Sequence, residues 1–239
     1  MAGLTDLLAA RAGAEPDRPA FVVDGADSLS FRSWERRSNA VARGLLDRGI
    51  GAGDRVVLWF DSRRWTEYAV ASAAVLKVGA VAVPVGAHRQ GLDLVGVLSH
   101  CGAAAIVVAA DSIVPAAVGV PDPRSGGRSG LSAASVADLA EGQPETPPPS
   151  PVPPEAIEIV YPSGHLRPPR PTVHAEAEIL GRLAATVRSG ETMLHAFAIG
   201  SDAARLALWA PLAPRSEGRS GPLAPRSEGR SGPGSATVV

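Results

Sequence analysis

Three short apolar runs, each separated from the next by a stretch with helical spacing, constrain the fold of this chain more than any other feature. The runs are Arg55 to Phe60 (RVVLWF), Ala80 to Val85 (AVAVPV) and Ala103 to Ala109 (AAAIVVA). Strands that are apolar along their whole length are typical of parallel sheets, because helices cover both faces of such sheets. The pattern therefore predicts an α/β fold of layered parallel sheets flanked by helices.

The residues before and between these runs fit the same scheme. Trp34, Val41 and Leu45 recur at helical spacing, and Gly49 is expected to end their helix. Two short strands are predicted to flank a turn at Asp24-Gly25. The strands are Ala20 to Val23 and Ser28 to Phe31, and the other helices are Leu4 to Gly13, Arg63 to Val78 and Gln90 to Cys101.

The second half of the chain is less regular. Gln143 to Pro154 (QPETPPPSPVPP) is a proline-rich linker, expected to be extended and to contribute no core residues. It follows the loop Pro121 to Gly130 and a short helix expected at Leu131 to Glu141. Beyond the linker we predict strands at Ile157 to Tyr161 and Thr192 to Ile199, and helices at Glu176 to Val187 and Asp202 to Trp209.

These patterns divide the chain into four regions. We predict a first α/β subdomain at 1–120, a Pro/Gly/Ser-rich linker with a short helix at 121–155, the remnant of a second α/β subdomain at 156–212 and a disordered tail at 213–239. The tail contains PLAPRSEGRSG twice without a mismatch. Two such short copies cannot form a solenoid. A flexible, solvated tail is expected; the alternative is a binding arm that uses Arg215, Arg219, Arg226 and Arg230.

Composition excludes several classes of protein. With 45% hydrophobic residues and a formal net charge of -1, the chain has no basic excess that would indicate nucleic acid binding. The longest apolar stretch, Ala69 to Val85, is alanine-rich and contains Lys77 and Pro84, so we expect no membrane span. Charged residues interrupt the first twenty positions where a signal peptide would be apolar. A cytoplasmic protein is therefore expected.

Three segments together carry a resemblance to a known family. The first is Ser30-Phe31, followed by a helix and Gly51 to Val57 (GAGDRVV). The second, Leu76 to Val85 (LKVGAVAVPV), is close to the motif LKAGAAYVPL, and the third runs from Tyr161 to His174. These segments resemble the adenylate-forming (AMP-binding) superfamily of acyl-CoA synthetases and adenylation domains, over about Leu4 to Leu212. The resemblance implies an incomplete N-terminal region of an AMP-binding ligase fold.

The third segment stands where the family has its phosphate-binding loop, of the type YTSGTTGxPKGV. The resemblance implies a nucleotide site at Ser163, Gly164, Arg167, Arg170 and His174. Here Arg167 replaces a glycine and Arg170 replaces the lysine. The loop also contains Pro162 and Pro171, which have no N–H group to offer a phosphate.

We therefore expect phosphate binding to be weakened, with either a residual anion site or a vestigial surface loop as the outcome. ATP or AMP with Mg is implied by the resemblance only, and no cofactor is expected to bind these residues in isolation. No metal site and no catalytic residue are expected. Lys77, the only lysine, matches a packing motif and is expected near carbonyl groups at a helix end.

Isolated residues offer weaker candidates. Cys101 is the only cysteine, which excludes an internal disulfide and a thiolate cluster. It is expected to be a small buried residue at a helix end, with a reactive thiol as the alternative. His88, His100 and His195 have no partner in the sequence pattern, and ordinary surface or core positions are expected for them.

The resulting hypothesis is a truncated, degenerate ligase-like protein, a pseudoenzyme without independent catalysis, because the family's downstream motifs have no counterpart in these residues. The first alternative is a non-catalytic module that docks an acyl carrier, a ligase or a separate C-terminal half. The second is a working ligase with a reduced mechanism. Because two strands form only a marginal sheet, we also expect self-association or a protein partner through residues 192–212, with Trp209 on the open surface.

Overall fold

A computed structural model describes residues 2–23, 27–87, 91–112, 131–149, 155–161, 171–186 and 193–213. The helices are α1 (Leu4–Ala14), α2 (Phe31–Asp47), α3 (Trp65–Lys77), α4 (Gly91–Cys101), α5 (Val136–Ala140), α6 (Glu176–Thr186) and α7 (Asp202–Trp209), with 3-10 turns at Ser62–Arg64 and Ala210–Leu212. The strands are β1 (Pro19–Val23), β2 (Asp27–Ser30), β3 (Arg55–Phe60), β4 (Val81–Gly86), β5 (Ala105–Val108), β6 (Ser132–Ser135), β7 (Glu158–Val160) and β8 (Thr172–His174).

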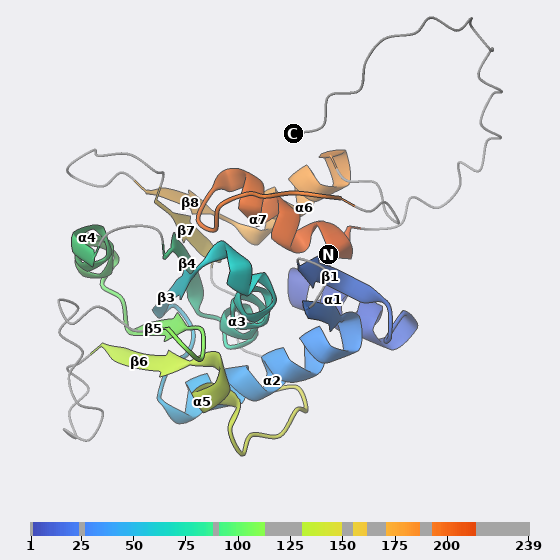
Figure 1. The fold of residues 1–239 in the computed structure, drawn as a ribbon, viewed down its shortest axis with the longest axis horizontal. Helices are drawn as coiled ribbons and strands as arrows, with labels where there is room; N and C mark the ends of the chain where they lie inside the picture. Colours follow the sequence, from blue (N-terminus) through green and yellow to red (C-terminus); the bar gives the residue numbers. More distant parts are fainter. Residues whose placement is uncertain are drawn as a thin grey trace, which may run out of the picture.

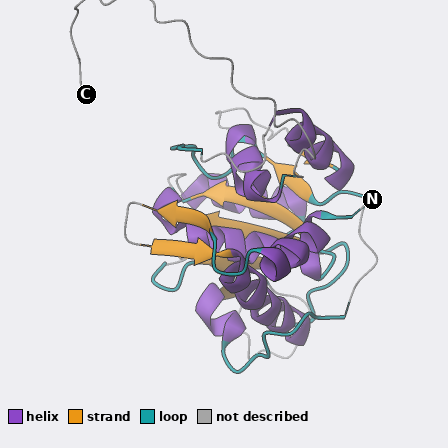
Figure 2. Ribbon diagram, turned by 90° about the vertical axis from the view of Figure 1, so that its right-hand side faces the viewer, coloured by secondary structure: helices purple, strands orange, loops and turns teal. Residues whose placement is uncertain are grey.

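A six-stranded sheet in the order β6-β5-β3-β4-β7-β8 forms the centre of the molecule (Figure 1). Neighbouring strands from β6 to β7 are parallel, and β8 is antiparallel to β7. Helix α4 packs on one face, and α2 and α3 pack on the other, so that helices cover both faces of the strands (Figures 1 and 2). The predicted α/β class is confirmed.

The apolar runs form strands because both of their faces are buried. In β3, Val56, Leu58 and Phe60 pack against α2 and α3, whereas Val57 and Trp59 pack against α4. All five are buried, so neither face of β3 needs polar side chains.

Local signals explain where helix α2 begins and ends. Ser30 precedes the helix, and its Oγ accepts a hydrogen bond from the N–H of Ser33 at 3.2 Å. Phe31, expected at the end of a strand, is therefore the first residue of α2. Gly49 follows the helix with a φ of 77°, a left-handed conformation that glycine adopts without steric penalty.

The region from Leu131 to Glu141 corrects one prediction. A single helix was expected, but Ser132–Ser135 forms strand β6 on β5 and only Val136–Ala140 is helical. Ser135 divides the two elements, because its Oγ accepts a hydrogen bond from the N–H of Asp138 at 3.0 Å. The sequence SAAS lacks the branched and aromatic residues that normally indicate a strand.

The expected second sheet is a further correction. Strand β7 pairs in parallel with β4, with Ala82 opposite Glu158, and so belongs to the central sheet. Residues 193–199, where a strand was predicted, contain no strand in the structure. Met193, Leu194 and Phe197 are exposed, and Ile199 at the end of the stretch is buried in the core. The regional boundaries at 120, 155 and 212 stay a prediction.

The described part of the proline-rich linker lies along helix α2. Asn39 donates a hydrogen bond to the carbonyl oxygen of Glu145 at 2.9 Å, and Arg43 donates to the carbonyl oxygens of Thr146 and Pro147 at 3.0 and 2.7 Å. Since proline-rich backbone has few N–H groups, these side chains bind its carbonyl oxygens instead. The segment is therefore anchored without adding to the core.

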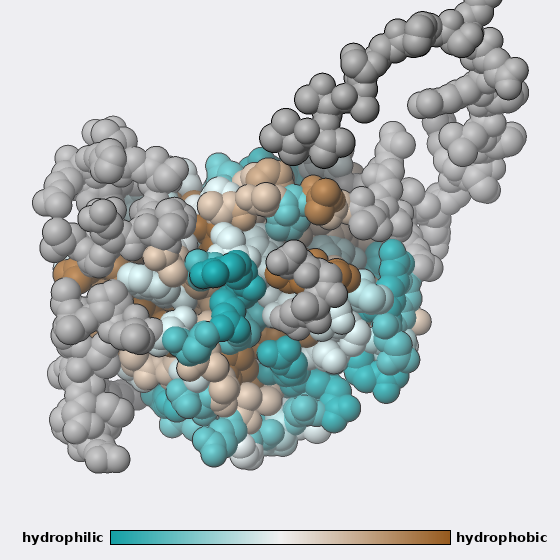
Figure 3. Space-filling view, viewed as in Figure 1, coloured by the Kyte–Doolittle hydropathy of each residue, from teal (hydrophilic) through white to brown (hydrophobic). Residues whose placement is uncertain are grey.

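The surface of the described residues is largely polar where helices face solvent. Hydrophilic residues cover much of the lower and right-hand part of Figure 3, where Figure 1 places α1, α2 and α5. Within the described ranges, no helix is long and apolar enough to cross a membrane. The predicted turn at 24–25, the loop at 121–130 and the repeats beyond 213 lie outside the described residues.

Candidate functional site

Strands β7 and β8 form an antiparallel hairpin that holds together the two ends of the predicted phosphate loop. Glu158 lies opposite His174, and Val160 lies opposite Thr172. The sequence prediction treated 161–174 as one loop and did not anticipate β8. The candidate residues Ser163, Gly164, Arg167 and Arg170 lie outside the described residues, so only the flanks of this loop are defined.

His174, the last candidate, is buried within the protein. Its exposed fraction is 8%. One ring nitrogen, Nδ1, lies 2.9 Å from Oε2 of Glu178, and the other, Nε2, lies 3.1 Å from Oγ1 of Thr172. The hydrogen bond with His174 lowers the pKa of the Glu178 carboxyl. Both nitrogens of the imidazole therefore have partners within the protein.

A buried ion pair that the sequence analysis did not anticipate lies beside the hairpin. Glu158 of β7 is 4% exposed and Arg205 of α7 is 1% exposed. Nη1 of Arg205 lies 3.6 Å from Oε2 of Glu158, and Nη2 lies 3.3 Å from Oδ1 of Asp202. Among the described residues, neither that Glu158 oxygen nor any guanidinium nitrogen of Arg205 has a hydrogen-bond partner of good geometry. Such a pair gains less from attraction than a hydrogen-bonded one and still loses hydration.

Burial dominates the ionisation of Glu158. It raises the pKa of the carboxyl from 4.5 to about 7, while the positive charge of Arg205 acts in the opposite direction. Asp202, whose side chain is 63% exposed, lies 3.9 Å from Nε2 of His174 and also faces Arg205. These polar side chains thus form a continuous cluster that connects β7, β8, α6 and α7.

The sequence does contain a signal for this cluster. Glu158 interrupts the apolar run IEIVY, and Arg205 interrupts the apolar helix AARLALW. A charged residue at a core position of a strand or helix is rarely buried unless it is paired. Two charged residues of opposite sign at core positions therefore indicate that the strand at 157–161 and the helix at 202–209 lie side by side.

Several other residues have definite structural partners. His100, expected to be isolated, has Nδ1 2.8 Å from the hydroxyl oxygen of Tyr161, directly before the loop. Burial raises the pKa of Tyr161 to about 12. His195 packs edge-on against Trp65 with ring centroids 4.6 Å apart, and burial lowers its pKa. His88 lies outside the described residues.

Lys77 and Cys101 have structural surroundings. Lys77 was expected near carbonyl groups of its own helix end, but it reaches across to α2. Its Nζ donates hydrogen bonds to Oε2 of Glu35 at 2.7 Å and to Oδ1 of Asn39 at 2.5 Å. Cys101 is the last residue of α4, at a helix end as predicted, but it is only half-buried. Burial raises the pKa of its thiol, which disfavours the reactive thiolate.

The described residues offer no group of three or more histidine, cysteine, aspartate or glutamate side chains placed to hold a metal ion. The hairpin, the buried charges and the tyrosine define the flanks of the predicted loop.

Comparison with protein-family models decides the family. The model described as "AMP-binding enzyme" matches residues 8–213. The chain belongs to the AMP-binding enzyme family. The predicted resemblance is confirmed, and the hairpin β7–β8 is the part of this AMP-binding family member that flanks the loop predicted from the motif.

Curated relatives of this AMP-binding chain include ligases and peptide synthetases. A medium-chain fatty-acid–CoA ligase of Escherichia coli K12 is 34% identical over 102 residues, which are 43% of this chain and 18% of the ligase. An isonitrile lipopeptide synthase of Mycobacterium tuberculosis is 28% identical over 214 residues, which are 87% of this chain and 8% of the synthase. The chain thus spans a small part of the length of these relatives.

Solved structures agree on the fold. The inhibitor-bound N-terminal domain of FACL13 from Mycobacterium tuberculosis has a TM-score of 0.73 at 22% identity, over 88% of this chain and 56% of that domain. The N-terminal subdomain of Klebsiella oxytoca NpsA, in complex with 3-hydroxybenzoyl-AMSN, has a TM-score of 0.70 at 23% identity, over 89% of this chain and 52% of the subdomain. The AMP-binding chain therefore corresponds to part of the N-terminal region of such enzymes.

Proposed function

We propose that these residues form an acyl-CoA-synthetase-type, AMP-dependent ligase-like region that does not catalyse adenylate formation on its own. Family membership and the ligases among the relatives support the ligase-like part. The absence of independent catalysis is the further step, and it rests on the loop and its flanks.

The observation that carries this step is the position of His174. It is the described residue of the predicted nucleotide site, and both of its ring nitrogens are engaged by Glu178 and Thr172. The substitutions within the loop act in the same direction. Prolines at 162 and 171 remove backbone donors, and Arg167 stands where a glycine would allow close approach of a phosphate. Each lost charge-assisted hydrogen bond costs about 1.5–3 kcal/mol of binding.

The family implies ATP or AMP with Mg, and the described flanks do not fit direct contacts to these groups. His174 is internally bonded, and Glu158, the nearest buried carboxylate, faces Arg205. Arg167 and Arg170 retain positive charge that would attract a phosphate as an ion pair. Weak anion binding at these arginines, without orientation for chemistry, is therefore the expected behaviour of the loop.

ATP–pyrophosphate exchange tests the proposal directly. We expect the purified chain to show no exchange above a buffer blank with short, medium or aromatic carboxylic acids. Exchange that is lost in Ser163→Ala would overturn the proposal, because that variant removes the hydroxyl retained from the family motif. A full-length ligase of the same family serves as the positive control.

A second candidate function is a binding module that docks an acyl carrier, a ligase or a separate C-terminal half. The favouring observation is the segment before α7, where Met193, Leu194 and Phe197 are 47%, 99% and 41% exposed. Adjacent exposed large apolar side chains are typical of contact surfaces. Co-purification with a tagged acyl carrier protein separates this function from the first, because a module that docks would retain the carrier.

A further inference from the structure

The topology of the sheet marks a second place where a ligand is expected, away from the β7–β8 hairpin. Strands β3 and β5 are neighbours, but the chain leaves them in opposite directions: β3 continues through α3 to β4, and β5 continues to β6 on the far side. In open α/β sheets, ligands bind at the carboxyl ends of strands where the connections diverge in this way. The two segments that begin there are Asp61–Arg64 and Ala109–Ser112.

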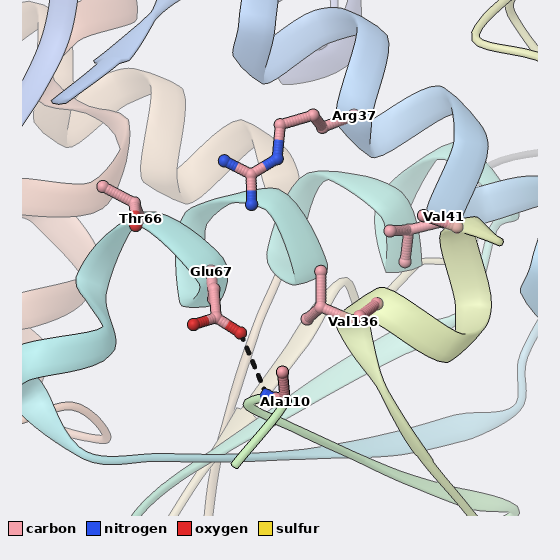
Figure 4. A pocket seen from close by; sticks show the side chains of 8 residues that line it. Arg37, Val41, Thr66, Glu67, Ala110 and Val136 are labelled. Atoms are coloured by element: carbon pink, nitrogen blue, oxygen red, sulfur yellow. Dashed lines mark hydrogen bonds between the residues drawn. The ribbon is translucent and has the colours of Figure 1, made fainter. Parts of the chain in front are cut away.

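Two hollows lie at this edge. The inner hollow, between α2, α3, α5 and the end of β5, has a volume of about 330 Å³, and the residues lining it include Arg37, Val41, Thr66, Glu67, Ala110 and Val136 (Figure 4). The outer hollow, of about 480 Å³, is lined by Asp61, Arg63, Arg64, Asp111 and Ser112. The inner hollow lies at the lower end of the volumes of small-molecule sites.

Among the charged residues that line the two hollows, Arg37 differs from the others in its lack of an ion-pair partner within the described ranges. Arg64 forms ion pairs with Glu67 and Asp111, and Arg63 pairs with Asp61 at 3.0 Å. Glu67 also accepts a hydrogen bond from the N–H of Ala110 at 3.2 Å. Within the described ranges, the half-buried Arg37 has no ion pair and no hydrogen bond. Figure 4 shows its guanidinium extending from α2 toward α3, on the inner hollow.

Apart from Arg37, Thr66 and Glu67, the residues lining the inner hollow are apolar. Val41 and Val136 lie on the side opposite Thr66 in Figure 4. Ala137 and Ala140, which follow Val136 in α5, also line the hollow. A guanidinium grips a carboxylate through two parallel hydrogen bonds, and the valine and alanine walls offer contact for a short hydrocarbon chain. Since Glu67 already has partners in Arg64 and Ala110, Arg37 remains the group that an anion would pair with.

We propose that the inner hollow is a binding site for a small carboxylate with a short aliphatic body, held through its anionic group by Arg37. This site goes beyond the proposed function. It is separated from the hairpin β7–β8 by β4 in the sheet, so neither the loop substitutions nor the outcome of the exchange assay affects it.

Amide NMR of the full chain tests the site with butyrate as the probe. We expect millimolar butyrate to shift the amide signals of Thr66, Glu67 and Ala110, and butyramide, its neutral counterpart, to leave them in place. Arg37→Gln should weaken the response about tenfold or more, because one charge-assisted contact is lost. Arg32→Gln removes an exposed charge from the same helix and should keep the response.

A second variant keeps the test decisive if Arg37→Gln fails to fold. Ala137 is exposed on α5, so Ala137→Leu fills the hollow without disturbing the core and should abolish the butyrate shifts. Equal shifts with butyramide, shifts that survive both variants, or no shifts at all would overturn the proposal. An equal response to inorganic phosphate would overturn the assignment of an aliphatic carboxylate.

Discussion

Glu158 is a carboxyl group buried in the sheet, and two effects act on its charge in opposite directions. Burial favours the neutral acid, and Arg205 favours the carboxylate. The gap of 3.6 Å between Nη1 of Arg205 and Oε2 of Glu158 is longer than a hydrogen bond. Burial therefore prevails, and the pKa of about 7 places the proton of Glu158 within the physiological range.

Replacing Glu158 with glutamine is expected to stabilise the protein above neutral pH and to change little in mild acid. The folded pKa of about 7 lies above the ordinary 4.5. The contribution of this carboxyl to the unfolding free energy is therefore fully present below the unfolded pKa and is lost as the pH rises through about 7. Glutamine avoids this loss, so the variant should gain roughly 1–3 kcal/mol at about pH 8 and little at about pH 5. Urea denaturation at both pH values measures the difference.

Glu178→Gln provides a control of opposite sign. The pKa of Glu178 is lowered by its hydrogen bond with His174, so its contribution is present above the unfolded pKa and is lost as the pH falls through the folded value. A Glu158→Gln variant that is less stable at about pH 8 than at about pH 5, relative to wild type, would show that the ion pair with Arg205 outweighs burial.

Gly44 is a second single residue whose replacement is expected to change stability, here through contacts of the backbone. It lies in the middle of α2, where glycine normally weakens a helix, but a Cβ there would overlap the carbonyl group of Leu139 on α5. Gly44→Ala is expected to cost about 1–3 kcal/mol of unfolding free energy, because backbone atoms must shift apart. Gly181→Ala on α6, where a Cβ meets no atom, should instead stabilise by about 0.5–1 kcal/mol. Thermal unfolding of both variants checks the contrast; equal effects would contradict it.

At the scale of elements, the spacing of apolar residues predicted the strands and helices whose own sequence carries a clear pattern. Strand β3 and helix α7 have the predicted boundaries, because β3 is a continuous apolar run buried on both faces and α7 has apolar residues at helical spacing. Strands β6 and β8 did not follow from the sequence. Each is short and lies at an edge of the sheet, and its pairing depends on a neighbour that local sequence does not reveal. The same limit hid the contact of Glu158 with Arg205, which joins segments far apart in the chain.

Lys77 of α3 connects this helix to α2, and replacing Lys77 measures how much the connection contributes to stability. Its Nζ binds Glu35 and Asn39 of α2, and burial lowers its pKa while Glu35 raises it. Lys77→Met should cost about 3–5 kcal/mol, because Glu35 is left with a half-buried, unpaired charge. Adding Glu35→Gln should recover part of the loss.

An exposed ion pair supplies the comparison for Lys77. Arg63, whose side chain is 90% exposed, pairs with Asp61, and Arg63→Met should change the unfolding free energy by less than about 1 kcal/mol. Denaturant unfolding measures both variants. If Lys77→Met lowers the unfolding free energy by no more than about 1 kcal/mol, Lys77 does not stabilise the packing of α2 against α3.

At the scale of the whole molecule, the C-terminal segment packs on the body. Trp209 is 2% exposed and stacks on Trp34 of α2 with ring centroids 5.9 Å apart. The expectation that Trp209 lies on an open surface is wrong, because α7 folds its apolar face against the first helices. The exposed apolar residues of the 192–212 region are those of the short stretch before α7.

Because Trp209 is buried, the residues available for self-association are the exposed apolar ones before α7. Self-association through residues 192–212 is still predicted, but through Met193, Leu194 and Phe197, whose exposed side chains gain by leaving water. Leu194→Ser with Phe197→Ser should shift the protein toward monomer in light scattering at micromolar concentration and leave the melting temperature nearly unchanged. Val22→Ser, at a 64% exposed valine on β1, is the matched control and should leave association intact.

Trp209→Ser should instead lower the unfolding free energy by about 3–5 kcal/mol, as expected for a core tryptophan. A monomeric wild-type protein would refute the association, and an oligomer unaffected by the double variant would place the interface elsewhere.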